Sequence, residues 1–372
     1  MKILQINKLY HPVIGGIETA VRQIAEGMNS TDGFKIDVLV CNNTFKTVDE
    51  NINGVSVIRA SSPGILFSMP VSTSFILLLK NMWAEYDILH VHLPFPLAEL
   101  ALWLVRPKNG IIITYHSDIV RQRFISSSIG WLHTWVLNRA ERIVVSSPNI
   151  IKSSPLLGDF GSKCDVIPFG VDIDRFNPHR GSRHKIEQIK REYGGKIVLF
   201  IGRLVYYKGL EYLIRAMKGI DARLLIIGEG PLKKTLANEV RKNGLENSVS
   251  FIPYQPHEEL INFYLASSAF VLPSVYRSEA FGITILEAMA CGLPVISTEL
   301  CTGTSYANQD GVTGFVVPPG DSRAINTALK KLLSDHTLLS GMGSAARRRV
   351  ETNFTINDML NGYKKLYKLK SL

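Results

Sequence analysis

The sequence predicts an α/β protein with two domains, each built around a parallel β-sheet. Short apolar runs alternate with longer amphipathic stretches along most of the chain, which is typical of parallel βα units. This alternation stops once near the middle and then resumes. The chain has 372 residues, which is more than one ordinary hydrophobic core holds.

The first half contains five apolar runs that we interpret as buried parallel strands, with helix-like segments between them. We expect these runs to belong to an N-terminal domain that spans residues 1–170. The runs are Lys2–Ile6, Lys35–Cys41, Asp87–Val91, Ile111–Tyr115 and Arg142–Val145.

The alternation stops between Pro168 and Gly195, in a stretch that contains Pro178, Gly181 and a polar, basic run. We therefore expect a linker over residues 171–195, a second domain over 196–354, and a helix over 355–372 that crosses back to the first domain. Because the second half repeats the pattern of the first, two Rossmann-like domains facing a central cleft result. The strands of the second half are predicted at Ile197–Ile201, Arg223–Ile227, Val249–Ile252 and Phe270–Leu272.

The net charge of +10 lies almost entirely in the second half of the chain. Up to Asp172 there are 15 basic and 14 acidic residues, against 27 and 18 after it. A polyanion ligand would explain the excess, but the run Arg347–Arg349 and the lysines of the C-terminal tail have helical spacing, so we expect a solvated face.

The four cysteines have no paired spacing, and no charged and apolar leader precedes the first strand, so we expect a reducing cytoplasmic location. The longest apolar runs fall far short of the roughly 20 residues that a membrane-spanning helix needs.

The stretch Ser278–Gly292, SEAFGITILEAMACG, carries the strongest functional signal. It places Glu279 eight residues before Glu287, across a loop that leads into an apolar helix. The first turn of that helix offers unpaired backbone N–H groups and the positive end of a dipole to a phosphate. The residues of this turn are Phe281, Gly282, Ile283 and Thr284.

Arg203 and Lys208 follow the apolar run at Ile197 and supply the cations that a diphosphate requires. Carboxylates repel phosphate, so Glu279 and Glu287 are better placed to accept hydrogen bonds from sugar hydroxyls. Since lone carboxylates on a buried helix cost free energy unless they are paired or bound to a ligand, we interpret this set as a nucleotide-sugar site.

Three further motifs carry weaker signals. Gly15 and Gly16 lie where a helix starts, so they allow ligand atoms near backbone amides or simply form a tight turn. His116 follows a strand, where it could contact a bound hexose or serve only as a capping partner for nearby loop residues. His90 and His92 share a strand face without a third metal ligand nearby, and are therefore better interpreted as core histidines.

The pair Asp172 and Asp174 has the D-x-D spacing of a divalent metal site. It follows a turn, however, where aspartate commonly accepts hydrogen bonds from local N–H groups. With Arg203 and Lys208 available to neutralise phosphate, we predict chemistry that is independent of metal and uses no cofactor.

Taken together, these motifs resemble the retaining nucleotide-sugar glycosyltransferases of family 4, which have the GT-B fold. The resemblance covers nearly the whole chain, and within the family it is strongest to bacterial polysaccharide mannosyltransferases that use GDP-mannose. The motifs are GGIE at Gly15, YHSD at Tyr115, PFGVD at Pro168, GRLVYYKG at Gly202, GEGP at Gly228 and EAFGITILEAMACGLPVI at Glu279.

The resemblance implies a role for each motif. Arg203 and Lys208 would bind the donor diphosphate, assisted by the amides of Ile283 and Thr284. Glu287 would hold the ribose hydroxyls. Glu279 and the backbone of Phe281 and Gly282 would contact the transferred hexose, with His116 near its far hydroxyl and Gly15 and Gly16 near the phosphate and acceptor. Phe169 and Pro253 depart from the family pattern, where Asn and Gly are common.

The function that follows is transfer of a hexose, with mannose from GDP-mannose favoured, onto a lipid-linked or polysaccharide acceptor in lipopolysaccharide O-antigen synthesis. The segment from Ile119 to Ile125, with Trp131, Trp135 and Arg139, interleaves cations with bulky apolar groups. It suits either peripheral contact with the cytoplasmic face of the inner membrane or a core-packing helix with a basic rim. A UDP-sugar transferase, an epimerase, a sugar phosphorylase and a non-catalytic polyanion-binding protein remain alternatives.

Overall fold

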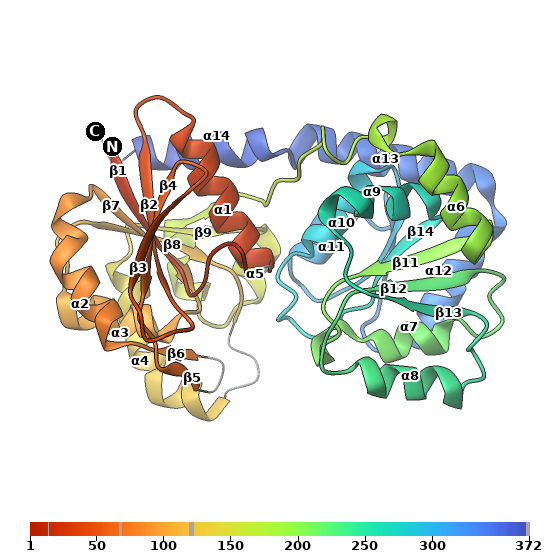
Figure 1. The fold of residues 1–372 in the computed structure, drawn as a ribbon, viewed down its shortest axis with the longest axis horizontal. Helices are drawn as coiled ribbons and strands as arrows, with labels where there is room; N and C mark the ends of the chain where they lie inside the picture. Colours follow the sequence, from red (N-terminus) through yellow and green to blue (C-terminus); the bar gives the residue numbers. More distant parts are fainter. Residues whose placement is uncertain (14, 67–68, 119–122, 370–372) are drawn as a thin grey trace. The chain divides into compact units, whose positions relative to one another are not determined.

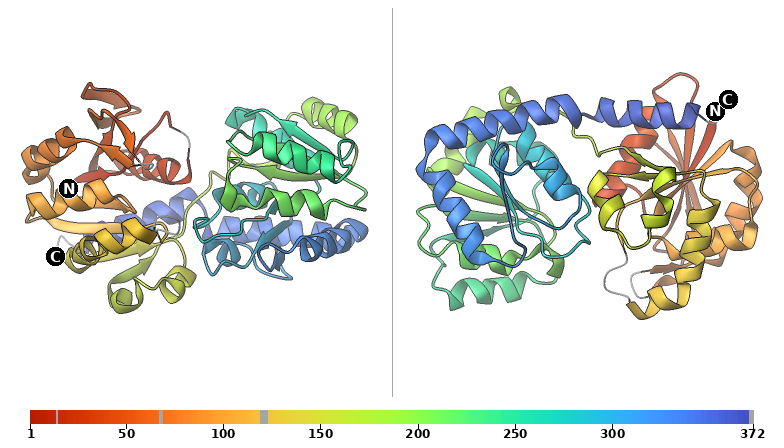
Figure 2. Two further views of the ribbon diagram at one scale, coloured as in Figure 1. Left: turned by 90° about the horizontal axis from the view of Figure 1, so that it is seen from below. Right: turned by 180° about the vertical axis from the view of Figure 1, so that it is seen from behind.

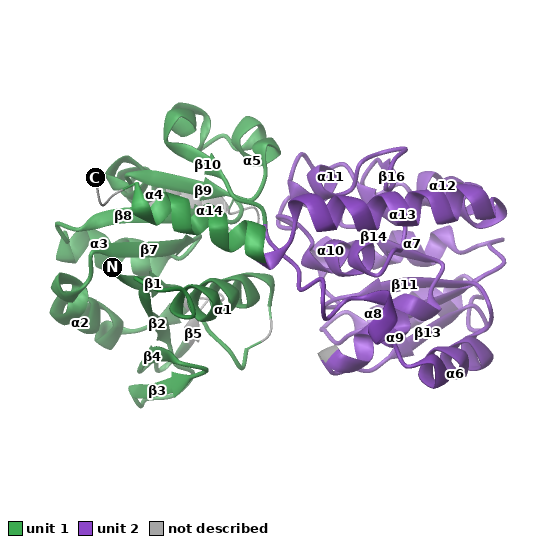
Figure 3. Ribbon diagram, turned by 90° about the horizontal axis from the view of Figure 1, so that it is seen from above, with its two compact units in different colours: residues 1–168, 357–372 green, residues 169–356 purple. Residues whose placement is uncertain are grey.

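The computed structural model describes residues 1–13, 15–66, 69–118 and 123–369 (Figure 1). The chain divides into two compact units, which Figure 3 distinguishes by colour. Unit 1 contains Met1–Pro168 and the segment that begins at Asn357, and unit 2 contains Phe169–Ile356.

Unit 1 is built on an eight-stranded sheet with the order β10-β9-β8-β7-β1-β2-β4-β3. All neighbours pair in parallel except β3 and β4, which form an antiparallel edge. The strands are β1 (Lys2–Ile6), β2 (Lys35–Cys41), β3 (Val48–Ile52), β4 (Val55–Ala60), β7 (Ile88–Leu93), β8 (Gly110–Tyr115), β9 (Arg142–Val145) and β10 (Cys164–Val166), and a separate ribbon pairs β5 (Gly64–Leu66) with β6 (Met69–Val71).

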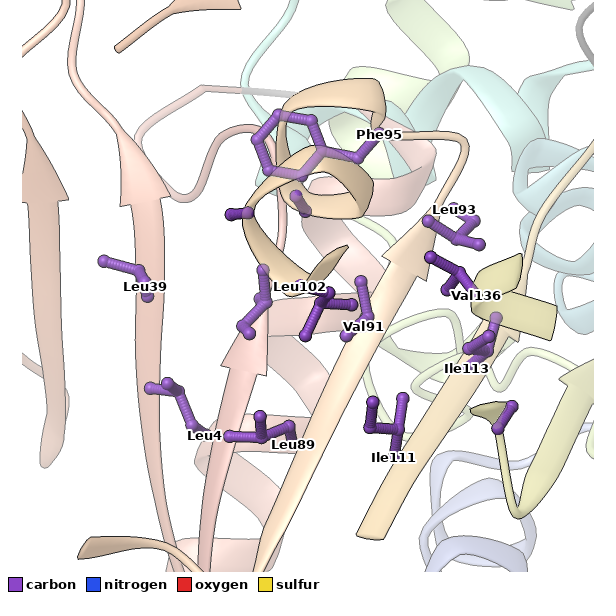
Figure 4. Packing of buried hydrophobic residues seen from close by; sticks show 14 of the residues in the cluster. Leu4, Leu39, Leu89, Val91, Leu93, Phe95, Leu102, Ile111, Ile113 and Val136 are labelled. Carbon is purple, nitrogen blue, oxygen red and sulfur yellow. The ribbon is translucent and has the colours of Figure 1, made fainter. Parts of the chain in front are cut away.

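Helices cover both faces of this sheet (Figures 1 and 2). Leu89, Val91 and Leu93 point from β7 into the apolar core beneath α2, α3 and α4 (Figure 4). Because side chains alternate along a strand, His90 and His92 point to the opposite face, where α1 and α14 pack. The helices of unit 1 are α1 (Gly16–Asn29), α2 (Thr73–Met82), α3 (Pro96–Val105), α4 (Arg123–Arg139), α5 (Pro148–Ser153) and α14 (Ile356–Lys368), with short 3₁₀ turns η1 (Trp83–Glu85) and η2 (Gly158–Lys163).

Unit 2 has a fully parallel six-stranded sheet with the order β13-β12-β11-β14-β15-β16. The chain runs outward from β11 in one direction, returns to β14, and then runs outward in the other direction. This is the Rossmann order, whose topological switch point lies between β11 and β14. The strands are β11 (Ile197–Ile201), β12 (Arg223–Ile227), β13 (Val249–Ile252), β14 (Ala269–Leu272), β15 (Val295–Thr298) and β16 (Gly314–Val317).

The helices of unit 2 follow its strands and connect them. They are α6 (Arg183–Tyr193), α7 (Leu210–Ala216), α8 (Lys233–Lys242), α9 (His257–Ala266), α10 (Ile283–Ala290), α11 (Gly303–Ala307), α12 (Ser322–Ser334) and α13 (His336–Asn353), together with 3₁₀ turns η3 (Pro178–Arg180) and η4 (Tyr206–Lys208).

The expected linker over residues 171–195 is instead part of unit 2, which begins at Phe169. Its basic run forms α6, which packs on α9: the Ser182 amide donates to Asn262 Oδ1 at 2.8 Å, and Lys185 pairs with Glu259 at 2.6 Å. Polar composition suggested a linker because only Ile189 of α6 is buried.

The expectation that Arg347–Arg349 form a solvated face is correct for Arg348 only, which is exposed. Arg347 donates to the carbonyl oxygens of Phe176 and Ala290, and Arg349 donates to those of Tyr306 and Ala307. Arg347 and Arg349 therefore satisfy carbonyl groups at the ends of α10 and α11, which the charge pattern alone does not reveal.

None of the described helices is both long enough and apolar enough to cross a bilayer. All four cysteines are free thiols.

Candidate active site

Two loops meet at the switch point of unit 2, one after β11 and one after β14. The amide of Val275 in the second loop donates to the carbonyl oxygen of Tyr207 in the first at 2.8 Å. Gly209 has a left-handed φ of 62°, and a Cβ there would lie 2.3 Å from the carbonyl oxygen of Pro273. Only glycine therefore allows the two loops to approach this closely.

Lys208 and Glu279 form a buried ion pair across these loops. The Lys208 Nζ lies 2.5 Å from Glu279 Oε2, and the two residues are 8% and 7% exposed. Ser274 Oγ donates to the same carboxylate oxygen at 2.9 Å. Arg203, in the same loop as Lys208, is exposed, and no described residue forms a hydrogen bond or ion pair with its guanidinium.

The main chain around Glu279 is fixed from a third loop, the one after β15. Thr302 Oγ1 donates to the carbonyl oxygen of Glu279 at 2.9 Å, and the amide of Gly303 donates to that of Ala280 at 2.8 Å. These bonds hold residues 279–282 in place at the entrance of α10.

Helix α10 begins at Ile283, after Gly282 in a left-handed conformation with a φ of 78°. Ile283 and Thr284 therefore provide the first-turn amides that lack intrahelical acceptors, as the sequence predicts. Phe281 does not belong to this turn. Its buried ring lies against Phe169 and Phe354 and anchors the loop, at centroid distances of 5.4 and 6.0 Å.

Glu287, one turn further along α10, is buried and accepts a hydrogen bond from the Tyr264 hydroxyl at 2.7 Å. Burial raises the pKa of Glu287 to about 7, although the Tyr264 hydrogen bond and the nearby Arg175 guanidinium act to lower it. Both glutamates thus have partners within the protein, which meets the requirement that buried carboxylates be paired.

In unit 1, Gly15 and Gly16 lie at the start of α1, beyond the carboxyl end of β1. Gly15 has an extended backbone, and a Cβ there would lie 2.2 Å from Glu18 Oε2. The glycine therefore makes room for the Glu18 side chain, which folds back over the start of the helix.

His116 follows β8 at the same edge of the unit 1 sheet and is buried. Its Nε2 lies 3.0 Å from Nδ1 of His92, and the two rings stack at 5.3 Å. His90 lies between the hydroxyls of Tyr367 and Thr114, each 2.7 Å away. The prediction that His90 and His92 are core histidines is confirmed, since neither is accessible to solvent.

Burial lowers the pKa of His90 and of His116 to about 3, and that of His92 well below its usual value. All three imidazoles are therefore neutral at physiological pH. No group of three or more His, Cys, Asp or Glu side chains in the described part of the chain is arranged to hold a metal ion.

The prediction that Asp172 accepts hydrogen bonds from local N–H groups is confirmed. Its Oδ1 accepts hydrogen bonds from the amides of Asp174 and Arg175, at 3.1 and 2.9 Å.

Sequence reasoning missed Ser274, Thr302 and Tyr264. Ser274 lies two residues beyond the end of β14, where polar side chains at a sheet's carboxyl edge are informative. Tyr264 sits in the apolar helix α9, where a buried hydroxyl needs a partner. The pairing of Tyr264 with Glu287 joins side chains from α9 and α10, 23 residues apart in the chain, which no local pattern specifies.

Each unit has a Rossmann-like sheet with parallel strands, and a chain with two such domains has the GT-B fold. Sucrose-phosphate synthase from Thermosynechococcus elongatus has this same chain architecture, with a TM-score of 0.84, 23% identity, and coverage of 99% of this chain and 98% of that one.

The chain belongs to glycosyltransferase family 4. Residues 14–175 match the family Glycosyltransferase Family 4, and residues 182–349 match Glycosyl transferases group 1. O-antigen chain mannosyltransferase C of Escherichia coli is 34% identical over 99% of this chain and 98% of its own. D-rhamnosyltransferase WbpZ of Pseudomonas aeruginosa is also 34% identical, over 95% of this chain and 92% of its own.

Proposed function

We propose that this enzyme transfers mannose from GDP-mannose, with retention of anomeric configuration, to a lipid-linked or polysaccharide acceptor in O-antigen synthesis. The support is the full-length similarity to a relative named as an O-antigen mannosyltransferase, together with the site in unit 2. The donor nucleotide rests on the family resemblance of the motifs at Tyr115 and Ser278 to mannosyltransferases that use GDP-mannose.

The buried pair of Lys208 and Glu279 carries this proposal. An ammonium group held at the switch point, beside the exposed Arg203 and the first-turn amides of Ile283 and Thr284, suits a diphosphate leaving group. The Glu279 carboxylate, which binds no phosphate, is then available to hydroxyl groups of the hexose. Glu287 would hold the ribose in the same way.

In the reaction we propose, the bond between the sugar's anomeric carbon and the diphosphate oxygen breaks, and a bond to the acceptor oxygen forms on the same face. The acceptor's proton passes to the departing phosphate. Arg203 and Lys208 stabilise the negative charge that develops there, with His116 as a neutral contact for the sugar. A double displacement would need a carboxylate on the reverse face of the sugar.

We further propose that the reaction needs no metal ion, because two cationic side chains and a helix N-terminus supply the positive charge that a metal would otherwise provide. Turnover should then be unchanged after exhaustive treatment with a chelator. If the chelator abolishes turnover and the addition of Mg²⁺ or Mn²⁺ restores it, the reaction depends on a metal ion and this proposal is wrong.

A membrane-facing surface on unit 1 would bring the enzyme to a lipid-linked acceptor on the cytoplasmic side of the inner membrane. Trp131 and Leu104 are 54% and 52% exposed, and the rings of Trp103 and Trp131 lie 5.4 Å apart, with Arg106 near Trp103. An exposed tryptophan beside a partly exposed one, with a cation nearby, suits a lipid interface. Ile119–Gln122, the start of the basic segment noted in the sequence, lie outside the described residues.

The membrane proposal is tested by flotation with vesicles that contain anionic lipid. We expect the wild type to float and the Trp131→Ala/Leu104→Ala variant to remain with the soluble fraction. Phosphatidylcholine vesicles serve as the control for charge. Equal flotation of both proteins would contradict the proposed surface.

The function itself is tested with a panel of GDP- and UDP-linked sugars, by following release of GDP or UDP that depends on a lipid-linked glycan acceptor. We expect GDP-mannose to support release and NMR of the product to show the α configuration of the donor. GDP-D-rhamnose belongs in the panel because of the sugar named for the Pseudomonas relative. If nucleotide is released only from UDP-sugars, GDP-mannose is not the donor. If a donor is converted when no acceptor is present, the enzyme is not a glycosyltransferase of the proposed kind.

A further inference from the structure

Tyr264 is buried beside Glu287, with two aromatic rings packed against its own. Its hydroxyl donates to Glu287 Oε2 at 2.7 Å, and both side chains are buried. The ring lies against Phe176 and Phe270, with centroids 5.9 Å away in each case. Because the aromatic neighbours fix the ring, the hydroxyl keeps one position and so fixes the carboxylate.

Tyr264 occupies only one of the two oxygens of Glu287. Among the described residues no other side chain donates to this carboxylate, although an ionised carboxylate accepts hydrogen bonds on both oxygens. Thr284 lies three residues earlier, on the same face of α10. Its Oγ1 is buried and has no hydrogen-bond partner in the described chain.

Thr284 Oγ1 and the second oxygen of Glu287 thus lie on one face of α10, and of the two only Thr284 Oγ1 is a buried atom without a partner in the described chain. Buried polar groups are normally satisfied, so a ligand with adjacent hydroxyl groups suits this face. The vicinal hydroxyls of a ribose have this chemistry.

We propose that Tyr264 is a positioning residue for nucleotide binding, which holds Glu287 with one carboxylate oxygen free for the ribose hydroxyls of the donor. This inference rests on the proposed function, because it takes the ligand of unit 2 to be a nucleotide. Tyr264 itself does not touch the ligand and acts through Glu287.

The hydrogen bond also favours the ionised form of Glu287. Burial raises the pKa of this carboxyl to about 7, and the Tyr264 hydroxyl and Arg175 lower it from a still higher value. Arg175 is paired with Glu258 at 3.1 Å. A further titratable neighbour is Cys291 at the end of α10, which itself lies near Arg347 of α13.

The strands β14 and β15 that flank α10 carry no titratable side chains. Loss of the Tyr264 hydroxyl therefore raises the pKa of Glu287. A larger fraction of the carboxyl is then protonated at neutral pH, and a protonated carboxyl is a poorer acceptor for ribose hydroxyls.

The test is Tyr264→Phe, which removes the hydroxyl and keeps the ring. We measure GDP and UDP binding by calorimetry from about pH 6 to about pH 9, and KM and kcat for the donor. A hydrogen bond to a charged group is strong enough that we expect Kd and KM to rise about tenfold at neutral pH, with kcat within about twofold of the wild type. The midpoint of the pH dependence of binding should move upward by about one unit.

Tyr363→Phe is the matched control, because Tyr363 is a buried tyrosine whose hydroxyl lies 3.1 Å from Thr114 Oγ1 in unit 1. It should leave nucleotide affinity and its pH dependence unchanged. If the Tyr264 hydroxyl had only a structural role, Tyr264→Phe would lower the midpoint of thermal unfolding without moving the pH dependence of nucleotide binding.

Glu287→Gln completes a double-mutant cycle. If Tyr264 acts through the carboxylate, Tyr264→Phe should change nucleotide affinity less than twofold in the Glu287→Gln background. Independent, multiplicative effects of the two changes would overturn the proposal, as would a Tyr264→Phe variant with wild-type affinity and pH profile. Wild-type protein that binds neither GDP nor UDP would instead overturn the proposed donor function, and this inference with it.

Discussion

Arg203 and Lys208 lie in one loop but in opposite environments. Lys208 is buried against Glu279, whereas Arg203 is exposed and has no partner among the described residues. Breaking a buried ion pair leaves an uncompensated charge in the interior, but removing an exposed side chain leaves none. The two cations should therefore differ in their effect on stability while sharing an effect on catalysis.

We predict that Arg203→Ala lowers turnover on the order of 100-fold, with an unchanged thermal midpoint, because it removes charge stabilisation from the leaving group only. Initial rates with GDP-mannose and a thermal melt of the same sample check both parts. Arg348→Ala is the matched control, since Arg348 is also an exposed arginine, on α13 of the same unit. If the Arg203→Ala variant has near-normal turnover, Arg203 does not belong to the phosphate site.

We predict that Lys208→Met lowers turnover on the order of 100- to 1000-fold and also lowers the thermal midpoint. Methionine fills the space of the lysine stem but leaves the Glu279 carboxylate buried with Ser274 as its remaining partner. In the double variant Lys208→Met/Glu279→Gln the stability should recover while turnover stays low. Recovery of turnover in that variant would show that Lys208 serves only to neutralise Glu279.

At the level of elements, α10 is held at both ends. Gly282 and the loop after β15 fix its beginning, and Arg347 of α13 binds the carbonyl oxygen of Ala290 at its end. The same guanidinium binds the carbonyl oxygen of Phe176 at 3.0 Å. A cation at a helix C-terminus satisfies orphan carbonyls and interacts favourably with the dipole.

We predict that Arg347→Ala destabilises unit 2 by about 1.5–3 kcal/mol, as expected for the loss of hydrogen bonds from a charged group. Weaker nucleotide binding should accompany it, because the helix that carries Thr284 and Glu287 loses its fixed end. Chemical denaturation followed by circular dichroism and nucleotide titration measure the two effects. The neighbouring Arg348→Ala should change neither, and equal effects of both variants would contradict the capping role.

The three histidines at the centre of unit 1 make its stability depend on pH. The unfolded chain binds protons at these imidazoles near pH 6.5, whereas the pKa values of His90 and His116 in the folded state are about 3. Between these values the unfolded state holds more protons, so stability falls as the pH drops below about 6.5.

We predict that the free energy of unfolding of unit 1 falls by up to about 1.4 kcal/mol per histidine for each unit by which the pH drops below about 6.5. Guanidinium unfolding at about pH 7.5 and about pH 5 checks it through tryptophan fluorescence, because all four tryptophans, at 83, 103, 131 and 135, lie in unit 1. His90→Gln should reduce the slope. A tryptophan transition that does not move with pH would contradict the burial of these imidazoles.

The sequence predicts the strands that are apolar throughout, because parallel strands buried on both faces leave a plain signal. β1, β2, β9, β11, β12 and β13 have the predicted bounds. The antiparallel edge strand β3 is polar and largely exposed. β15 and β16 have only four residues each, with Ser297 and Thr298 in β15 and Gly314 at the start of β16, so neither stands out as an apolar run. α6 was missed because a single buried isoleucine leaves almost no helical periodicity.

Within the candidate site, residues on the loops that follow strands were predictable, whereas their partners were not. Lys208 and Glu279 are 71 residues apart in sequence, and their contact depends on the switch-point topology. Tyr264 and Arg347 act across helix interfaces, and such interfaces follow from packing rather than from local pattern.

For the whole molecule, the division into units does not follow the order of the chain. Unit 2 is one continuous segment, whereas unit 1 is completed by residues from Asn357 onward. The side chains of α14 that unit 1 buries are Met359, Tyr363, Leu366 and Tyr367. The hydroxyl of Tyr367 also binds His90, so α14 belongs to the polar interior of unit 1 as well as to its apolar core.

We predict that truncation before Asn357 abolishes the cooperative unfolding transition of unit 1. Loss of several buried side chains at about 2–5 kcal/mol each is comparable to the whole stability of a domain, about 5–15 kcal/mol. Tryptophan fluorescence should lose its transition while circular dichroism retains that of unit 2. Lys365→Ala, a change on the exposed side of α14, is the control. A truncated protein with a normal tryptophan transition would contradict this account.

Because α14 follows unit 2 in the chain, unit 1 stays incomplete while the ribosome is still making unit 2. The first 168 residues emerge before the 188-residue segment of unit 2, and their sheet lacks the helix that covers His90 until the residues after Ile356 have been added. A newly made chain thus has an open N-terminal unit while unit 2 is being synthesised, a period in which chaperones have access to it.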